Sequence, residues 1–125
     1  MNEKITKVID KIASNIDQVQ EIRSSGSEYY FKFKGHAMSI MQRQNHEEDG
    51  ESPYRFFLYP KWSGSLDKLV HTLDFSQPED DFPIASYDAR DAPEIKLRTL
   101  YKLLQKEHEG VDRMLDDILA EDVPF

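Results

Sequence analysis

The sequence predicts an α+β fold in which an antiparallel β-meander of three to five strands is packed by an N-terminal and a C-terminal helix. Apolar residues recur at helical spacing near both ends of the chain, and between these ends they alternate with polar residues. The chain has 125 residues, of which 38% are hydrophobic, and this is enough for one domain with its own core. We therefore expect a single α+β domain over residues 1–125, with a short acidic tip at 121–125.

An amphipathic helix is expected from about residue 3 to residue 18. Its apolar positions share one face and are Ile5, Val8, Ile9, Ile12, Ile16 and Val19. Charged residues such as Lys7 and Asp10 lie between these positions. The helix should therefore lay its isoleucine-rich stripe on a sheet.

The middle of the chain predicts the strands, because turn residues separate segments of alternating polarity. The expected strands cover residues 20–24, 28–34, 36–44, 54–61 and 84–87, and Gly35 allows a tight connection between the second and the third. Side chains alternate across a strand, so one set should face the core. That set is Phe31, Phe33, Met38, Ile40, Phe56 and Leu58.

Two more helices are expected in the second half of the chain. Ser65 should cap a short helix over residues 66–73, and Asp91 should cap the final helix with Glu94 as its capping-box partner. The final helix carries one apolar stripe, made of Leu97, Leu100, Tyr101, Leu104, Val111, Leu115, Ile118 and Leu119. Gly110 lies inside this stripe, so it either kinks one long helix or separates two.

The chain ends with an acid, an aliphatic residue, a proline and a phenylalanine, which are Asp122, Val123, Pro124 and Phe125. At ordinary residue usage such an ending occurs by chance in roughly one chain in 10⁴ to 10⁵. This tip alone resembles that of bacterial single-stranded-DNA-binding proteins, which recruits partners that act on single-stranded DNA. The resemblance implies that a partner takes the Phe125 ring into an apolar pocket and pairs its carboxylate with Arg or Lys. The alternative is that Phe125 packs on its own domain.

The strand register also places aromatic and basic side chains together on the sheet face opposite the predicted core. The candidate nucleic-acid-binding residues of this aromatic-basic face are Tyr30, Lys32, Lys34, Arg43, Arg55, Phe57, Tyr59, Lys61 and Trp62, and Met41 lies among them. Bases stack on aromatic rings and cations bind phosphates, so the face predicts a platform for single-stranded DNA. The alternative is that a further helix or a partner chain covers it.

The net charge of −8 lies in the second half of the chain. Residues 1–62 contain nine basic and nine acidic residues, whereas residues 63–125 contain seven and fifteen. A strongly acidic protein repels nucleic acid at long range, but the neutral first half leaves room for a local binding face.

No residue pattern predicts catalysis or a cofactor. The sequence has no Cys, which excludes disulfides and thiolate metal sites and favours a reducing compartment. Its four His residues show no paired ligand spacing, and the acidic runs at 46–49 and 79–81 are typical of solvated loops. The chain shows neither a signal peptide nor a long apolar run, so we expect a cytoplasmic protein with no metal and no membrane partner.

Taken together, these features predict a non-enzymatic interaction protein of bacterial or phage origin that acts around single-stranded DNA. It would hold the DNA on the aromatic-basic face and recruit replication or repair proteins through Phe125. The alternative is an acidic protein-binding module, such as an inhibitor, an immunity protein, an adaptor or a DNA mimic, with no nucleic-acid contact. The sequence leaves the partner and the oligomeric state open.

Overall fold

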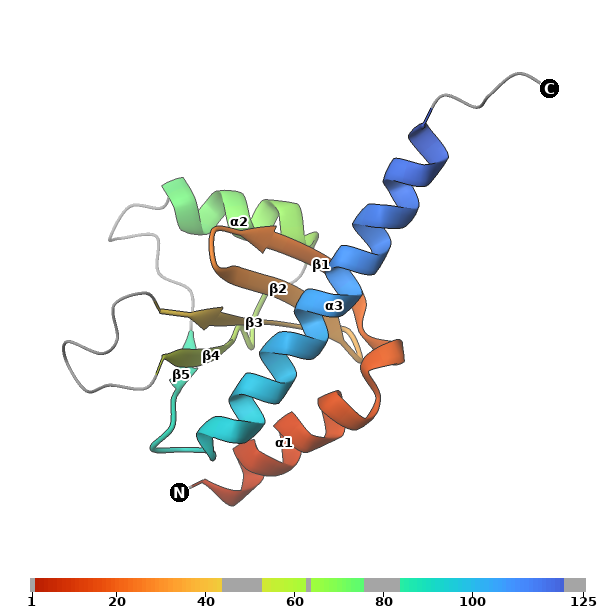
Figure 1. Cartoon of the computed structure of the whole chain (residues 1–125). Coiled ribbons are helices and arrows are strands. Elements are labelled where there is room, and N and C mark those ends of the chain that lie inside the picture. Colours follow the sequence, from red (N-terminus) through yellow and green to blue (C-terminus); the bar gives the residue numbers. More distant parts are fainter. Residues whose placement is uncertain (1, 44–52, 63, 76–83, 121–125) are drawn as a thin grey trace.

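In the residues that the computed structural model describes (2–43, 53–62, 64–75 and 84–120), five strands form one antiparallel sheet with helices on both faces (Figure 1). The elements are α1 (Glu3–Ser14), the 3-10 helix η1 (Ile16–Gln18), β1 (Gln20–Ser25), β2 (Glu28–Phe33), β3 (His36–Gln42), β4 (Tyr54–Leu58), α2 (Leu66–Phe75), β5 (Ala85–Tyr87) and α3 (Glu94–Leu119). Each strand pairs with the next along the chain. The predicted α+β meander is confirmed.

The turn between β2 and β3 has two residues. Phe33 pairs with His36, and between them Lys34 and Gly35 have φ angles of 53° and 81°. Two successive positive φ angles are typical of a type I′ hairpin, which favours glycine at the second position. The predicted tight connection at Gly35 is therefore confirmed, and β2 ends one residue earlier than expected because Lys34 belongs to the turn.

Helices α1 and α3 lie side by side on one face of the sheet and bury the main core (Figure 1). The predicted inward-facing set is confirmed, since Phe31, Ile40 and Phe56 have no exposed surface and the others belong to the same cluster. The helices contribute Ile5, Ile9, Ile12, Leu97, Leu100, Tyr101 and Leu104. Burial of so many large apolar side chains is the main stabilising term of the fold.

Helix α2 lies on the opposite face, next to β1 and β2 (Figure 1). Leu66 and Leu69 are fully buried there and form a second, smaller cluster with Tyr30, Ala37 and Tyr59. The sheet therefore has an apolar layer on each side. This second layer was one of the two alternatives that the sequence left open for the aromatic-basic face.

Side chains cap two of the helices: the predicted cap at Ser65 is confirmed, and Asn2 caps α1 without having been predicted. Asn2 Oδ1 accepts a hydrogen bond from the N–H of Ile5 at 3.1 Å, and Ser65 Oγ accepts one from the N–H of Lys68 at 3.2 Å. The first helix is shorter than expected, because α1 ends at Ser14 and a separate 3-10 turn follows.

The predicted cap at Asp91 is wrong. Helix α3 begins at Glu94 after Pro93, and no side chain caps it. The Asp91 carboxylate instead accepts the N–H of Asp88 at 3.0 Å, within the turn that links β5 to α3. Asp91 and Ala92 also donate their own N–H groups to the Asp88 carbonyl. Asp91 therefore stabilises that turn through both its side chain and its backbone.

Candidate functional site

Helix α2 covers part of the aromatic-basic face. Tyr30 and Tyr59, two of the rings proposed to stack on bases, are each only 4% exposed, and their centroids lie 6.4 Å apart in a stacked arrangement. Leu66 and Leu69 pack against them. A base can therefore reach these two rings only if α2 moves away.

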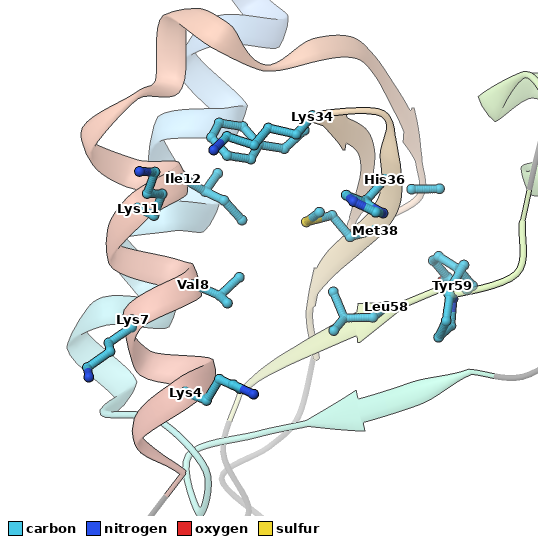
Figure 2. A pocket seen from close by; sticks show the side chains of 13 residues that line it. Lys4, Lys7, Val8, Lys11, Ile12, Lys34, His36, Met38, Leu58 and Tyr59 are labelled. Atoms are coloured by element: carbon cyan, nitrogen blue, oxygen red, sulfur yellow. The ribbon is translucent and has the colours of Figure 1, made fainter.

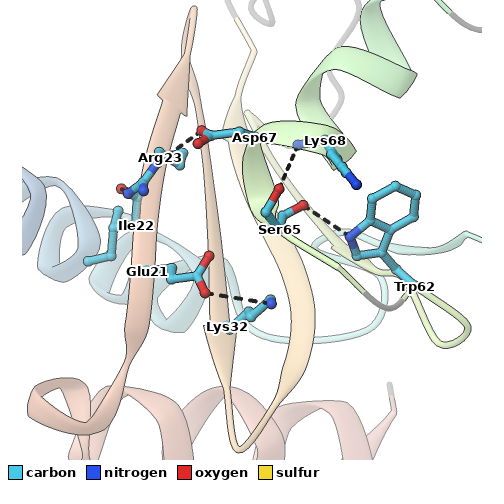
Figure 3. Close-up of polar contacts among 8 residues, drawn as sticks. All are labelled: Glu21, Ile22, Arg23, Lys32, Trp62, Ser65, Asp67 and Lys68. Carbon is cyan, nitrogen blue, oxygen red and sulfur yellow. Dashed lines mark hydrogen bonds and ion pairs between the residues drawn. The ribbon is translucent and has the colours of Figure 1, made fainter.

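The remaining members of this face are divided: Met41 and Arg55 are paired across β3 and β4 with Phe57 nearby, whereas Lys32 and Lys34 lie on β2 and the turn after it. Lys32 is half-buried, and its Nζ lies 3.6 Å from Glu21 Oε1 (Figure 3). Lys34 lies in the β2–β3 turn and points toward α1 (Figure 2). Of the other members of this face, Lys61 is exposed, and five are half-buried: Met41, Arg43, Arg55, Phe57 and Trp62. Trp62 is held against the start of α2, since its Nε1 donates to the Ser65 carbonyl at 3.3 Å (Figure 3).

A hydroxyl network lies under α2 on the same face. Ser39 has no exposed surface, donates from Oγ to Glu28 Oε2 at 2.6 Å, and lies 2.8 Å from the Tyr59 hydroxyl. Tyr30 donates to the other Glu28 oxygen at 2.9 Å. Burial raises the pKa of Tyr59, and the nearby Glu28 charge adds to this effect, whereas the Ser39 hydrogen bond opposes it. The network provides hydrogen-bond partners for polar groups that are buried under α2. Because Ser39 has no exposed surface, its hydroxyl is not accessible to a substrate.

Helix α3 continues through Gly110 as one helix and projects from the domain (Figure 1). The last residue with a described ring contact to the body is His108, whose ring centroid lies 5.6 Å from that of Tyr29. Every described side chain from residue 109 to residue 120 is exposed. At 1.5 Å per residue, the projecting part, residues 109–119, is about 16 Å long.

The predicted apolar stripe of this helix is therefore divided. Its first four members, Leu97, Leu100, Tyr101 and Leu104, are buried in the main core. Its last four do not pack on the sheet. With Met114 they form an exposed stripe, 50–80% accessible, of Val111, Met114, Leu115, Ile118 and Leu119. The projecting part also carries the acids Glu109, Asp112, Asp116 and Asp117, with Arg113 as its one basic residue.

A pocket of about 600 Å³ lies on the α1 side of the fold, between α1, the β2–β3 turn and the end of β4 (Figure 2). Apolar side chains including Val8, Ile12, Phe33, Met38 and Leu58 line it, together with Lys4, Lys7, Lys11, Lys34 and His36. The sequence gives only a weak signal for this pocket, because Lys4, Lys7 and Lys11 are typical of the solvent-facing charges of an amphipathic helix. Their spacing of three and four residues beside Val8 is the one feature that could have indicated a shared basic edge.

Comparison with known proteins gives no further guide to function. No protein-family model, no curated protein and no solved structure matches the chain. Within the described residues, no group of three or more His, Asp or Glu side chains is placed to hold a metal ion. In the same residues, no helix is long and apolar enough to cross a membrane. The tip residues Asp122 to Phe125 lie outside the described part of the chain.

Proposed function

We propose that the protein is a non-enzymatic interaction protein that binds a partner protein through the projecting part of α3. The exposed stripe carries this proposal, since five large apolar side chains follow one another on a helix that leaves its own domain. Contiguous exposed apolar surface of this kind marks interaction sites in soluble proteins. An amphipathic helix presented in this way fits an apolar groove, with anchors at helical spacing.

The charge of the projecting part specifies the chemistry of that groove. Acidic residues such as Glu109, Asp116 and Asp117 border the stripe, so the complementary groove has Lys or Arg at its rim. The tip at 122–125 follows directly in the sequence, and its resemblance supports partners that act on single-stranded DNA. The same surface also fits the alternative of an acidic protein-binding module without nucleic acid.

A matched pair of variants tests the proposal. Ile118 and Ile95 are both 64% exposed on α3, but Ile118 lies in the projecting part and Ile95 in the first turns of the helix. We expect proteins captured from an extract of the source organism to be lost with an Ile118→Ser and Leu115→Ser double variant and retained with Ile95→Ser. The captured protein, purified, should then bind the wild-type chain directly and bind the double variant at least tenfold more weakly. Equal binding by all three chains would exclude the stripe as the docking surface.

Direct binding of single-stranded DNA is a separate prediction with a separate test. The only Trp of the chain, Trp62, lies at the edge of the aromatic-basic face, so its emission should report an oligonucleotide there. Salt-sensitive quenching at micromolar concentration would support a DNA platform. Unchanged emission at low salt would leave a protein-binding module that contacts no DNA.

A further inference from the structure

Helix α1 separates its charges between two sides. Lys4, Lys7 and Lys11 lie beside Val8 on the side that lines the pocket. Asp10 lies on the other side, toward α3, where its Oδ2 accepts a hydrogen bond from Lys96 Nζ at 2.6 Å. Asp10 is thus engaged away from the pocket. The other acid of the helix, Glu3, does not line the pocket, and the charged residues of α1 that do are all lysines.

The opposite wall of the pocket adds another lysine. Lys34 is fixed in the type I′ turn and reaches from it toward α1, while Lys4 reaches from α1 toward β4 (Figure 2). Lys7 and Lys11 point outward and extend the basic edge (Figure 2). Among the residues that the structure describes, no Asp or Glu lines the pocket, although the whole chain has a net charge of −8. None of the four lysines forms an ion pair with a described residue.

The interior of the pocket is apolar and open to solvent. Val8 and Leu58 face the main core but are only half-buried, so part of their apolar surface meets water at the pocket. Phe33 and Met38 complete the interior. A volume of about 600 Å³ lies within the range of small-molecule sites, which combine an apolar lining with a few polar groups.

We propose that this pocket binds a single-chain anionic amphiphile, with its apolar chain against Val8, Met38 and Leu58 and its head group at one of the two lysines that flank these side chains, Lys4 or Lys34 (Figure 2). Charge complementarity selects an anion, because the described residues that line the pocket include lysines and no acid. Lysine acts as a compact point charge and lacks the planar fork of arginine, so it does not impose one head-group geometry. The site therefore selects the sign of the charge and the chain length, and it accepts a carboxylate or a sulfate.

Calorimetric titration with free amphiphiles below their micelle concentration tests both parts of the proposal. Octanoate, decanoate and dodecanoate should bind with affinities that rise roughly fourfold per added methylene group, as expected for burial of the chain. At equal chain length, decanoate and decyl sulfate should bind similarly. Decanol should bind roughly tenfold more weakly, and decyltrimethylammonium should not bind.

A matched pair of double variants tests the place of the head group. Lys4→Gln with Lys34→Gln should weaken decanoate binding roughly tenfold and leave decanol binding unchanged. Lys102→Gln with Lys106→Gln makes the same change in net charge at two exposed positions of α3 and should leave decanoate binding unchanged. An equal loss in both pairs would show that only the net charge matters and would overturn the proposed site.

Methyl chemical shifts distinguish this site from the exposed stripe of α3. Decanoate should shift the methyl signals of Val8, Met38 and Leu58 and leave those of Leu115 and Ile118 in place. Shifts confined to α3 would overturn the proposal, as would binding to anionic vesicles without binding of free decanoate. These results do not depend on a protein partner, so the pocket and the proposed function stand or fall separately.

Discussion

The two parts of α3 carry the same apolar pattern but meet different surroundings. From Glu94 to His108 the helix lies on the sheet and buries Leu97, Leu100 and Leu104, whereas beyond His108 its apolar residues face solvent. Helical periodicity fixes which residues share a face, but it does not specify what covers that face. The body of the domain covers the first part of the stripe. The second part faces solvent, and we propose that a partner covers it.

The largest expected effect is a difference in stability between the two parts. Leu100→Ala removes a fully buried side chain and should lower the free energy of unfolding by about 2–5 kcal/mol. Leu115 is 50% exposed, so Leu115→Ala should lower the free energy of unfolding by no more than about 0.5 kcal/mol. Urea denaturation of both variants measures the difference. Similar losses of stability at the two positions would mean that the projecting part packs on the domain in solution, and the two parts of α3 would then not differ in their surroundings.

A smaller effect is expected from the aromatic contacts that hold the anchored part. Tyr101 donates a hydrogen bond to the Ser27 carbonyl at 2.9 Å, and its ring centroid lies 5.2 Å from that of Tyr29. Tyr101→Phe should cost about 0.5–1.5 kcal/mol at neutral pH, because one hydrogen bond is lost.

The same variant should also change the alkaline limb of the stability curve. Burial raises the pKa of Tyr101 in the folded protein, and the neighbouring Tyr29 and Tyr54 add to this effect. In the unfolded chain a tyrosine titrates near a pKa of about 10. The contribution of the protonated Tyr101 hydroxyl to stability is therefore fully present below about pH 10, and it is lost as the pH rises through the pKa of Tyr101 in the folded protein. Tyr101→Phe should lose less stability between neutral and alkaline pH than the wild type. An unchanged slope would show that other groups govern this limb.

Local patterns predicted the parts of the fold that depend on neighbouring residues. Ser65 caps α2 through its own hydroxyl, and Gly35 supplies the turn conformation that side-chain-bearing residues avoid. Phe31 and Phe56 face the core because alternation on a strand leaves no other choice once one face is buried. These features need no knowledge of distant contacts.

Features that depend on packing between distant elements were not predictable in this way. The position of α2 over Tyr30 and Tyr59 depends on how residues 66–75 pack on β1 and β2, which lie much earlier in the chain, and no periodicity encodes that contact. The pocket depends on the gap between α1 and the end of β4, which only the three-dimensional arrangement defines. The exposed half of the stripe depends on where the sheet ends beneath α3. Asp91 fitted the capping pattern, but its side chain closes the preceding turn.

The smallest expected effect concerns Gly110, near the point where the two parts of α3 meet. Beyond its chain neighbours and the backbone of its own helix, a Cβ at this position would meet no described atom within 4 Å, and glycine inside a helix costs about 0.5–1 kcal/mol relative to alanine. Gly110→Ala should therefore strengthen the projecting helix and slow amide hydrogen exchange at residues 111–119 by roughly two- to fivefold. The midpoint of urea unfolding should hardly move, because the anchored part determines it.

A glycine in a different backbone conformation provides the control for Gly110. Gly35 has a φ of 81°, a conformation that alanine disfavours, so Gly35→Ala should destabilise the whole domain and leave the relative protection of the projecting helix unchanged. If the partner binds the projecting part as a helix, Gly110→Ala should also raise its affinity by up to the same two- to fivefold factor, since less ordering remains to be done on binding. Faster exchange at residues 111–119 in Gly110→Ala would show that a glycine is needed there, and the projecting part would then have to function bent or unwound.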